Sequence, residues 1–149
     1  MLIYLLDEDD FVVTPAVSRG IQFYEISENL YYKSDDIEIE VFVGDAREYI
    51  KRLSNIHIVY QDAFSPKVNQ ELWTFEYFTD ISNILNESGI ITTYSVATPV
   101  RCSFYKLGMN IYTHPYENIR KGTIASFAEL PFVKVDFEEK LKRVKCKTY

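Results

Sequence analysis

Three carboxylates, Glu25, Asp45 and Asp62, stand at or just after the ends of short apolar segments. A carboxylate at a strand end can accept two hydrogen bonds from the diol of a ribose, and we expect this of Glu25. Asp45 lies between Gly44 and Ala46. Its carboxylate could accept from the exocyclic amine of adenine, while the N–H of Ala46 meets a ring nitrogen. The pattern indicates a nucleoside site; the alternative is ordinary polar loops.

Asp62 opens the segment 62–70 (DAFSPKVNQ), which reads as a loop because of its proline and polar residues. Phe64, Pro66 and Trp73 would surround the carboxylate with apolar groups and strengthen its attraction to a cation. The aromatic rings could also contact a sulfonium or an ammonium group by cation–π attraction. We therefore expect this loop to recognise an amine. The alternative is that Phe64 and Trp73 are core residues.

The elements that must position these carboxylates alternate between strand and helix. Apolar or alternating runs predict strands, and apolar residues spaced by three or four predict helices. Such alternation is typical of a mostly parallel, doubly wound α/β sheet, in which ligands bind at the carboxyl ends of the strands. If the first three strands are parallel neighbours, the three carboxylates share one crevice. The expected strands are 21–26, 37–43, 56–60, 90–94, 109–112 and 123–127, and the expected helices are 46–53, 71–85 and 98–107.

The composition predicts one folded, cytoplasmic domain. Of the 149 residues, 47% are hydrophobic, and 12 Tyr and 10 Phe exclude disorder as the main description. No run approaches the roughly 18 apolar residues of a membrane span, so we expect no membrane association. Cys102 and Cys146 cannot form a disulfide framework, so we expect them to be reduced. His57 and His114 lack ligand spacing, so we expect no metal.

Charge is distributed unevenly along the chain. The net charge is −6, yet residues 1–50 contain 12 acidic and 3 basic residues, whereas 10 basic and 5 acidic residues follow from Arg101 onward. The whole chain is too acidic for a non-specific nucleic-acid binder. Its basic C-terminal third could still contact a phosphate backbone. The alternative is a solvated surface with no partner.

Several segments together resemble a known family. The set resembles the methyltransferase domain of the tRNA 5-methylaminomethyl-2-thiouridine biosynthesis enzymes, the MnmC family, in its form without the FAD-dependent oxidase half. The resemblance covers roughly Ile21 to Phe127, and the block around Asp62 is its specific part. The segments, in order, are Glu25, Gly44–Arg47 (GDAR), Asp62–Thr74 (DAFSPKVNQELWT), Ser95–Leu107 and Arg120–Thr123.

The resemblance implies a Rossmann-like sheet of a methyltransferase dependent on S-adenosylmethionine (SAM) within residues 1–130, followed by a charged tail or helix over 131–149. It implies SAM as cofactor, with no metal and no FAD. The methyl acceptor would be the primary amine of 5-aminomethyl-2-thiouridine at the wobble position of tRNA, and Asp62 would orient that amine and help to remove its proton. The resemblance assigns the ribose hydroxyls of SAM to Glu25 and the adenine amine to Asp45, and it places Arg101, Arg120 and Lys121 on the side that faces tRNA. Together with the residues around them, the expected cofactor site is Glu25, Gly44, Asp45 and Ala46, and the expected substrate site is Phe64, Pro66, Trp73, Ser95, Arg101 and Lys121.

The sequence departs from the family at the glycine-rich loop that normally meets the methionine part of SAM. No two of the five glycines lie closer than 14 residues, so no G-x-G-x-G is present. The pattern therefore looks like a sheet truncated at its N-terminus, with Met1–Leu6 as the tail of the helix that follows the loop. An exposed strand edge would favour a homo-oligomer.

Two alternatives remain open. One is a non-catalytic remnant or binding module that does not bind SAM. The more distant one is an aminopropyltransferase of the spermidine synthase type, whose pattern is acidic and Gly-Pro-rich where this chain has Ala63-Phe64-Ser65-Pro66.

Overall fold

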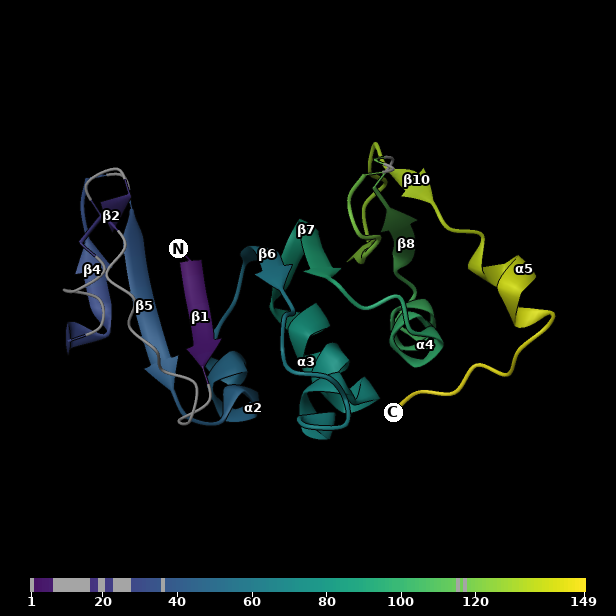
Figure 1. Ribbon diagram of the computed structural model, residues 1–149, viewed down its shortest axis with the longest axis horizontal. Coiled ribbons are helices and arrows are strands. Elements are labelled where there is room, and N and C mark those ends of the chain that lie inside the picture. The colour runs from purple at the N-terminus through teal and green to yellow at the C-terminus, as the bar shows by residue number, and fades with distance from the viewer. Residues whose placement is uncertain are drawn as a thin grey trace. The chain divides into compact units, whose positions relative to one another are not determined.

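The computed structural model describes residues 2–6, 17–18, 21–22, 28–35, 37–114, 116 and 118–149 (Figure 1). The chain divides into an N-terminal unit, Met1–Tyr49, and a C-terminal unit, Ile50–Tyr149. Glu25 and the end of the strand expected at 21–26 lie outside the described residues.

The N-terminal unit contains a three-stranded sheet in the order β1-β5-β4, in which β1 is parallel and β4 antiparallel to β5. The strand expected at 37–43 is confirmed as β5, whose Ile39 and Val41 are buried and alternate with exposed glutamates. The bounds are β1 Leu2–Leu6, β4 Tyr31–Lys33 and β5 Glu38–Val43, with a small antiparallel pair of β2 Val17–Ser18 and β3 Ile21–Gln22.

The expectation that Met1–Leu6 is the tail of a helix is wrong. Leu2–Leu6 is a strand, paired in parallel with β5 from Ile39 to Val43. A short apolar run has no periodicity that distinguishes a buried strand from a segment of a helix. The pairing with β5 therefore decides that these residues form a strand.

The helix expected at 46–53 is confirmed as two short elements. It begins as α2, Ala46–Tyr49, in the N-terminal unit and ends as the 3-10 helix η1, Ile50–Arg52, in the C-terminal unit. Ala46, Tyr49 and Ile50 are buried, as their spacing on one face predicts.

The C-terminal unit contains a five-stranded mixed sheet in the order β10-β8-β9-β7-β6. Only β6 and β7 are parallel among its pairs, and the rest are antiparallel. The strands are confirmed, but the expectation of a mostly parallel sheet is wrong for this unit, because periodicity does not encode strand direction. The bounds are β6 Ile56–Tyr60, β7 Leu85–Thr93, β8 Asn110–Thr113, β9 Thr123–Ser126 and β10 Val133–Lys134.

Helices pack on this sheet around an aromatic core. Phe78 of α3 and Phe104 of α4 are fully buried, and their rings meet edge to face at 4.8 Å. Thr74 caps α3 by accepting from Tyr77 N at 3.2 Å. No described helix is long and apolar enough to cross a membrane. The helices are η2 Gln70–Trp73, α3 Phe75–Ile84, α4 Thr98–Lys106 and α5 Phe137–Leu141.

Gly89 allows two strands to approach closely. It lies within β7, and a Cβ built on it would lie 2.8 Å from the carbonyl oxygen of Ile56 in β6. The pairing of these strands shifts register at Ile56–Ile58. The close approach of the two strands is thus the reason why glycine occupies this position of β7.

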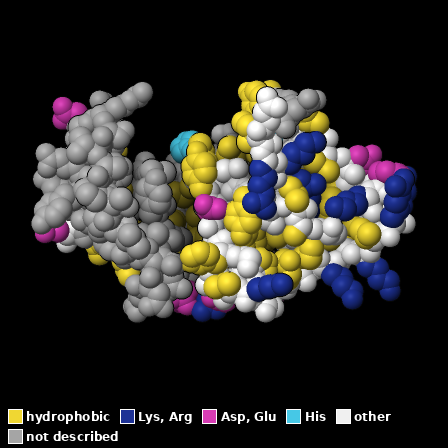
Figure 2. Space-filling view, viewed as in Figure 1, with side chains coloured by type: hydrophobic (Ala, Val, Ile, Leu, Met, Phe, Trp, Pro, Cys, Tyr) yellow, Lys and Arg dark blue, Asp and Glu magenta, His cyan; other side chains and the backbone are white. Residues whose placement is uncertain are grey.

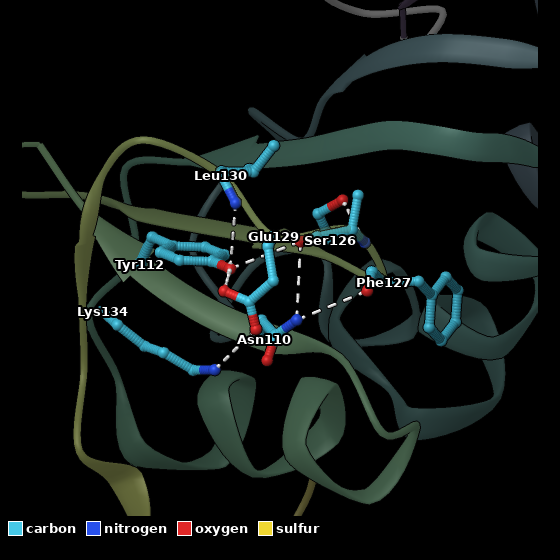
Figure 3. Close-up of polar contacts among 8 residues, drawn as sticks. Asn110, Tyr112, Ser126, Phe127, Glu129, Leu130 and Lys134 are labelled. Atoms are coloured by element: carbon cyan, nitrogen blue, oxygen red, sulfur yellow. Dashed lines mark hydrogen bonds and ion pairs between the residues drawn. The ribbon is translucent and has the colours of Figure 1, made fainter.

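A polar network fixes the turn that follows β9 (Figure 3). Tyr112 Oη donates to Glu129 Oε2 at 3.2 Å and accepts from the N–H of Leu130 at 3.2 Å. Lys134 on β10 donates to Glu129 Oε1 at 3.1 Å. This network connects the turn to β8 and β10.

Candidate active site

The parallel strands β6 and β7 place two chain segments side by side at their carboxyl ends. Tyr60 is in register with Thr92, and Gln61 N donates to the carbonyl oxygen of Thr92 at 2.8 Å. Asp62 leaves β6 at this point, and Tyr94 follows β7. The expectation that Asp62 follows the strand 56–60 is confirmed. The parallel neighbour of this strand is β7, whereas β5, the strand expected at 37–43, belongs to a different sheet, so the assumption that these two strands are neighbours is wrong.

Buried side chains hold the loop that begins at Asp62. Gln61 is buried and donates from Nε2 to the carbonyl oxygen of Leu72 at 2.8 Å. Trp73 is 0% exposed, and its Nε1 donates to the carbonyl oxygen of Phe64 at 2.6 Å. A side chain with no exposed surface cannot form a wall for a substrate, so that prediction for Trp73 is wrong. Trp73 instead supports the loop from the core.

Asp62 and Tyr94 interact at the start of this loop. Tyr94 Oη donates to the carbonyl oxygen of Ala63 at 3.0 Å, and its ring meets that of Trp73 edge to face at 5.7 Å. Burial and then the negative charge of Asp62 raise the pKa of the Tyr94 phenol. Asp62 itself is exposed, so the expectation that apolar groups shield its carboxylate from solvent is wrong. Sequence reasoning missed Tyr94, although its position after the neighbouring strand was a usable signal.

Arg120 brings a positive charge to the same place. Its guanidinium lies 5.8 Å from the centre of the Tyr94 ring, and its charge acts against that of Asp62 on the phenol. His114 Nε2 lies 3.1 Å from the carbonyl oxygen of Arg120. A Cβ on Gly122 would lie 2.5 Å from the carbonyl oxygen of Thr93. The backbone that follows Arg120 therefore passes directly against the end of β7. The neighbouring Lys121 is exposed.

Apolar side chains line the exposed part of the loop. Phe64 is 53% exposed, while its carbonyl oxygen is held by Trp73. Pro66 is half-buried. Phe64 thus presents an aromatic ring to solvent on a backbone that is fixed beneath it.

Ser95 and Arg101 have internal roles. The carbonyl oxygen of Ser95 accepts from Thr123 Oγ1 at 2.6 Å, and its Oγ accepts from Ala97 N before α4 begins. Arg101 donates from Nε to Thr123 Oγ1 at 3.0 Å and from Nη2 to the carbonyl oxygen of Gly122 at 3.3 Å. Burial lowers the pKa of Arg101. The guanidinium of Arg101 fastens α4 to the start of β9, and its expected contact with RNA stays a prediction.

In the N-terminal unit, Gly44 ends β5 in a conformation that favours glycine. Its φ is +145°, and a Cβ would lie 2.9 Å from the Phe42 ring. Phe42 in turn stacks on Tyr49 of α2 at 4.3 Å. The turn that carries Asp45 is therefore fixed by packing on both sides.

Asp45 starts α2 and pairs with a nearby arginine. Its Oδ1 accepts from Arg47 N at 2.9 Å, and its two oxygens accept from Arg47 Nε at 2.9 Å and Nη2 at 2.6 Å. The Asp45 side chain is 43% exposed. A carboxylate offers about four acceptor positions, and Arg47 donates to both oxygens of Asp45, so a nucleoside amine would have to share this carboxylate with Arg47. The assignment of Asp45 to the adenosine part of SAM stays a prediction.

The predicted residues fall into two groups. Within the described residues, no cluster of three or more His, Cys, Asp or Glu side chains suits a metal. Gly44, Asp45 and Ala46 share one turn of the N-terminal unit. At the carboxyl ends of β6 and β7 in the C-terminal unit, the predicted Asp62 and Arg120 lie around Tyr94, which was not predicted. Phe64 and Pro66 follow Asp62 on the same loop, Ser95 follows Tyr94, and Lys121 follows Arg120.

Comparison with known proteins gives a consistent result. A family model for S-adenosyl-L-methionine-dependent methyltransferases matches residues 13–128. An uncharacterized protein of Methanocaldococcus jannaschii is 37% identical over 81 residues, which are 54% of this chain and 23% of that protein. The tRNA 5-methylaminomethyl-2-thiouridine biosynthesis bifunctional protein MnmC of Legionella pneumophila (strain Lens) is 35% identical over 83 residues, 55% of this chain and 12% of that protein.

The fold also has a solved counterpart. The crystal structure of MNMC2 from Aquifex aeolicus matches with a TM-score of 0.70 and 30% identity, covering 94% of this chain and 48% of that one. The chain thus spans less than half of each of these three relatives. The likeness confirms the expected Rossmann-like α/β class. Because the family model matches well over half of the sequence, this chain belongs to the S-adenosyl-L-methionine-dependent methyltransferases and is similar to the MnmC proteins.

Proposed function

We propose that this chain transfers the methyl group of SAM to a primary amine of tRNA. The acceptor is the aminomethyl group of a 5-aminomethyl-2-thiouridine at the wobble position, and the product is the methylaminomethyl nucleoside. The observation that carries the proposal is the exposed carboxylate of Asp62 on a firmly held loop at the end of β6. The named MnmC relatives support the choice of acceptor.

SAM, when bound, supplies a methyl group that is activated by a sulfonium. In this proposal Asp45 accepts from the adenine amine, and the backbone of Gly44 and Ala46 lies against the adenine ring. Glu25 holds the ribose hydroxyls. The partly exposed Asp45 carboxylate and the fixed turn around Gly44 support these roles.

Asp62 handles the acceptor amine. A primary amine is mostly protonated at neutral pH, yet only the neutral amine carries the lone pair that forms the new N–C bond. The Asp62 carboxylate attracts the ammonium form, orients it and accepts a proton from it. Orientation supplies a large share of the rate in such an in-line displacement. The exposure of Asp62 allows a macromolecular substrate to reach it.

The surroundings of Asp62 suit a nucleotide. Phe64 presents a ring on which an unstacked base can lie. Arg120 and Lys121 can contact phosphate, and Lys and Arg side chains (dark blue in Figure 2) lie on the face of the C-terminal unit that is in view. An anionic group for the amine and cationic groups for phosphate thus occur together at the end of β7.

The test is methyl transfer to two matched tRNA samples, one with the aminomethyl group on its wobble uridine and one without it. We expect SAM-dependent methylation of the first sample only, detected by mass spectrometry of the nucleosides. Removing Arg120 and Lys121 together by alanine substitution should weaken tRNA binding, whereas Lys134→Ala on β10 should not. If the chain binds SAM but methylates neither tRNA, the proposed methyl acceptor is wrong. If the folded chain binds no SAM, the alternative of a non-catalytic module is favoured.

A further inference from the structure

The two cysteines, 44 residues apart in the sequence, meet in the structure. Cys102 lies on α4 and is 0% exposed, whereas Cys146 is half-buried. Cys146 Sγ donates to the carbonyl oxygen of Cys102 at 3.9 Å. Burial, followed by a hydrogen bond between the two thiols, raises the pKa of Cys102 to about 12. The Cys146 sulfur therefore lies against the residue that carries the second thiol.

Cys146 lies in the most basic part of the chain. Residues 140–147, which we term the basic segment, contain five Lys or Arg residues and no acidic residue. Its N-terminal end is anchored by Phe137 of α5, which is 3% exposed and lies 5.7 Å from the ring of Tyr105 on α4. At its far end, the contact of Cys146 with Cys102 connects it to α4 again.

We propose that Cys102 and Cys146 form a reversible disulfide that fastens the basic segment to α4. The oxidant is a small disulfide such as oxidised glutathione. The Cys146 thiolate attacks it, forming a mixed disulfide and releasing one glutathione thiol. The Cys102 thiol then loses its proton and attacks the Cys146 sulfur, which forms the Cys102–Cys146 bond and releases the second glutathione. The protein loses two hydrogens and two electrons, and the oxidant gains them.

Accessibility sets the order of these steps. An external disulfide can reach the half-buried Cys146, but it cannot reach Cys102 in the folded protein. The positive charges of Lys106 and Lys140 act on Cys102 and favour its thiolate, which is the attacking form in the second step. Their attraction opposes the effect of burial. The second step is thus the slower one, and the contact of the Cys146 sulfur with Cys102 is what allows it to occur.

The disulfide would change how the basic segment is held. In the reduced protein a weak S–H···O contact connects Cys146 to α4, and exposed ion pairs connect Glu139 to Lys142 and Arg143. A covalent bond at Cys146 would leave the basic segment attached to α4 at both ends. Its five positive charges would then be displayed in one arrangement rather than several.

The experiment treats the folded chain with oxidised glutathione and maps disulfides by non-reducing peptide mass spectrometry. We expect loss of both free thiols, a mass decrease of two hydrogen atoms and a linked pair of peptides containing Cys102 and Cys146. Amide hydrogen exchange in residues 140–147 should become slower, and dithiothreitol should reverse both changes. Because no step requires SAM or tRNA, the outcome is independent of the proposed methyl transfer.

Two variants separate the proposal from its alternatives. C102S should retain a stable glutathione adduct on Cys146, because no second thiol is present to displace it. C146S should remain unmodified while folded, since Cys102 is inaccessible, which circular dichroism before and after treatment would verify. A wild-type product with glutathione still on Cys146, or with a disulfide between two chains, would overturn the proposal.

Discussion

Asp45 and Asp62 both follow a parallel strand, but the structure holds them in opposite ways. The Asp45 carboxylate is itself engaged, because it accepts from the backbone of α2 and from the Arg47 guanidinium. At Asp62 the surrounding backbone is held instead, through Trp73 and Tyr94, and the carboxylate is left exposed.

This difference matches the roles that we propose for the two residues. A carboxylate that recognises a nucleoside edge benefits from a fixed orientation, because directional hydrogen bonds lose strength when they are misaligned. A carboxylate that must first bind a proton-bearing amine and then take the proton needs free acceptor positions. Four predictions test whether the two residues are held as differently as the structure indicates.

Trp73→Ala should have the largest effect. It removes a fully buried side chain together with the hydrogen bond to Phe64, and such truncations cost about 3–5 kcal/mol of unfolding free energy. Urea unfolding followed by circular dichroism would measure it, because Trp73 is the sole tryptophan and its fluorescence is lost. Hydrogen exchange should rise in residues 61–69 and not in 45–49; equal increases in both would contradict the separate anchoring of the two carboxylates.

Asp45→Asn should act on SAM and spare the fold. Asparagine is also a good helix N-cap, so the free energy of unfolding should change little. A hydrogen bond to a charged group contributes about 1.5–3 kcal/mol, so the affinity for SAM should fall by roughly 10- to 150-fold. Calorimetric titration would measure the loss. Asp35→Asn, an exposed acid of the same unit, is the matched control, and equal affinities for all three proteins would exclude Asp45 from the SAM site.

Tyr94→Phe should have a smaller effect that depends on pH. It removes the hydrogen bond to Ala63 but keeps the ring, at a cost of about 0.5–1.5 kcal/mol. The pKa of this phenol is raised above its usual 10.0, so the folded state favours the protonated form. The stability advantage of the wild type should therefore be complete below pH 10 and disappear as the pH rises through the folded-state pKa. Tyr105→Phe is the control; a difference that does not change with pH would exclude a titrating Tyr94.

Arg47→Gln should have the smallest effect. The pair with Asp45 has good geometry, but both side chains are nearly half exposed. Exposed ion pairs contribute about 0.2–1 kcal/mol, and salt screens them. Unfolding in low and high salt would measure the difference, which should vanish in high salt. A loss well above this range would show that Arg47 supports more than the Asp45 turn.

Sequence patterns predicted the strands of the candidate site because those patterns are local. The alternation in 37–43 and the apolar run in 56–60 sufficed to place Asp45 and Asp62 at strand ends. The spacing of apolar positions likewise predicted α3. In each of these segments, the apolar positions that predict a strand or a helix lie within the segment itself.

The remaining features depend on partners distant in the sequence. The antiparallel direction of β8 and β9 is set by their neighbours, which no periodicity reports. Whether Trp73 faces solvent depends on the core beneath it, and Arg101 finds its partners 21 and 22 residues away. Tyr94 was overlooked for the same reason, since its contact with Ala63 spans 31 residues.

The central claim is that Asp62 acts on the acceptor amine and not on SAM. The most direct measurement compares wild type, Asp62→Asn and the exposed-acid control Glu87→Gln for SAM affinity and for single-turnover methyl transfer to aminomethyl-bearing tRNA. We predict equal SAM affinity in all three, and a transfer rate that falls roughly 100- to 10,000-fold in Asp62→Asn alone. Unchanged transfer by Asp62→Asn, with SAM bound as tightly as in the wild type, would contradict the account.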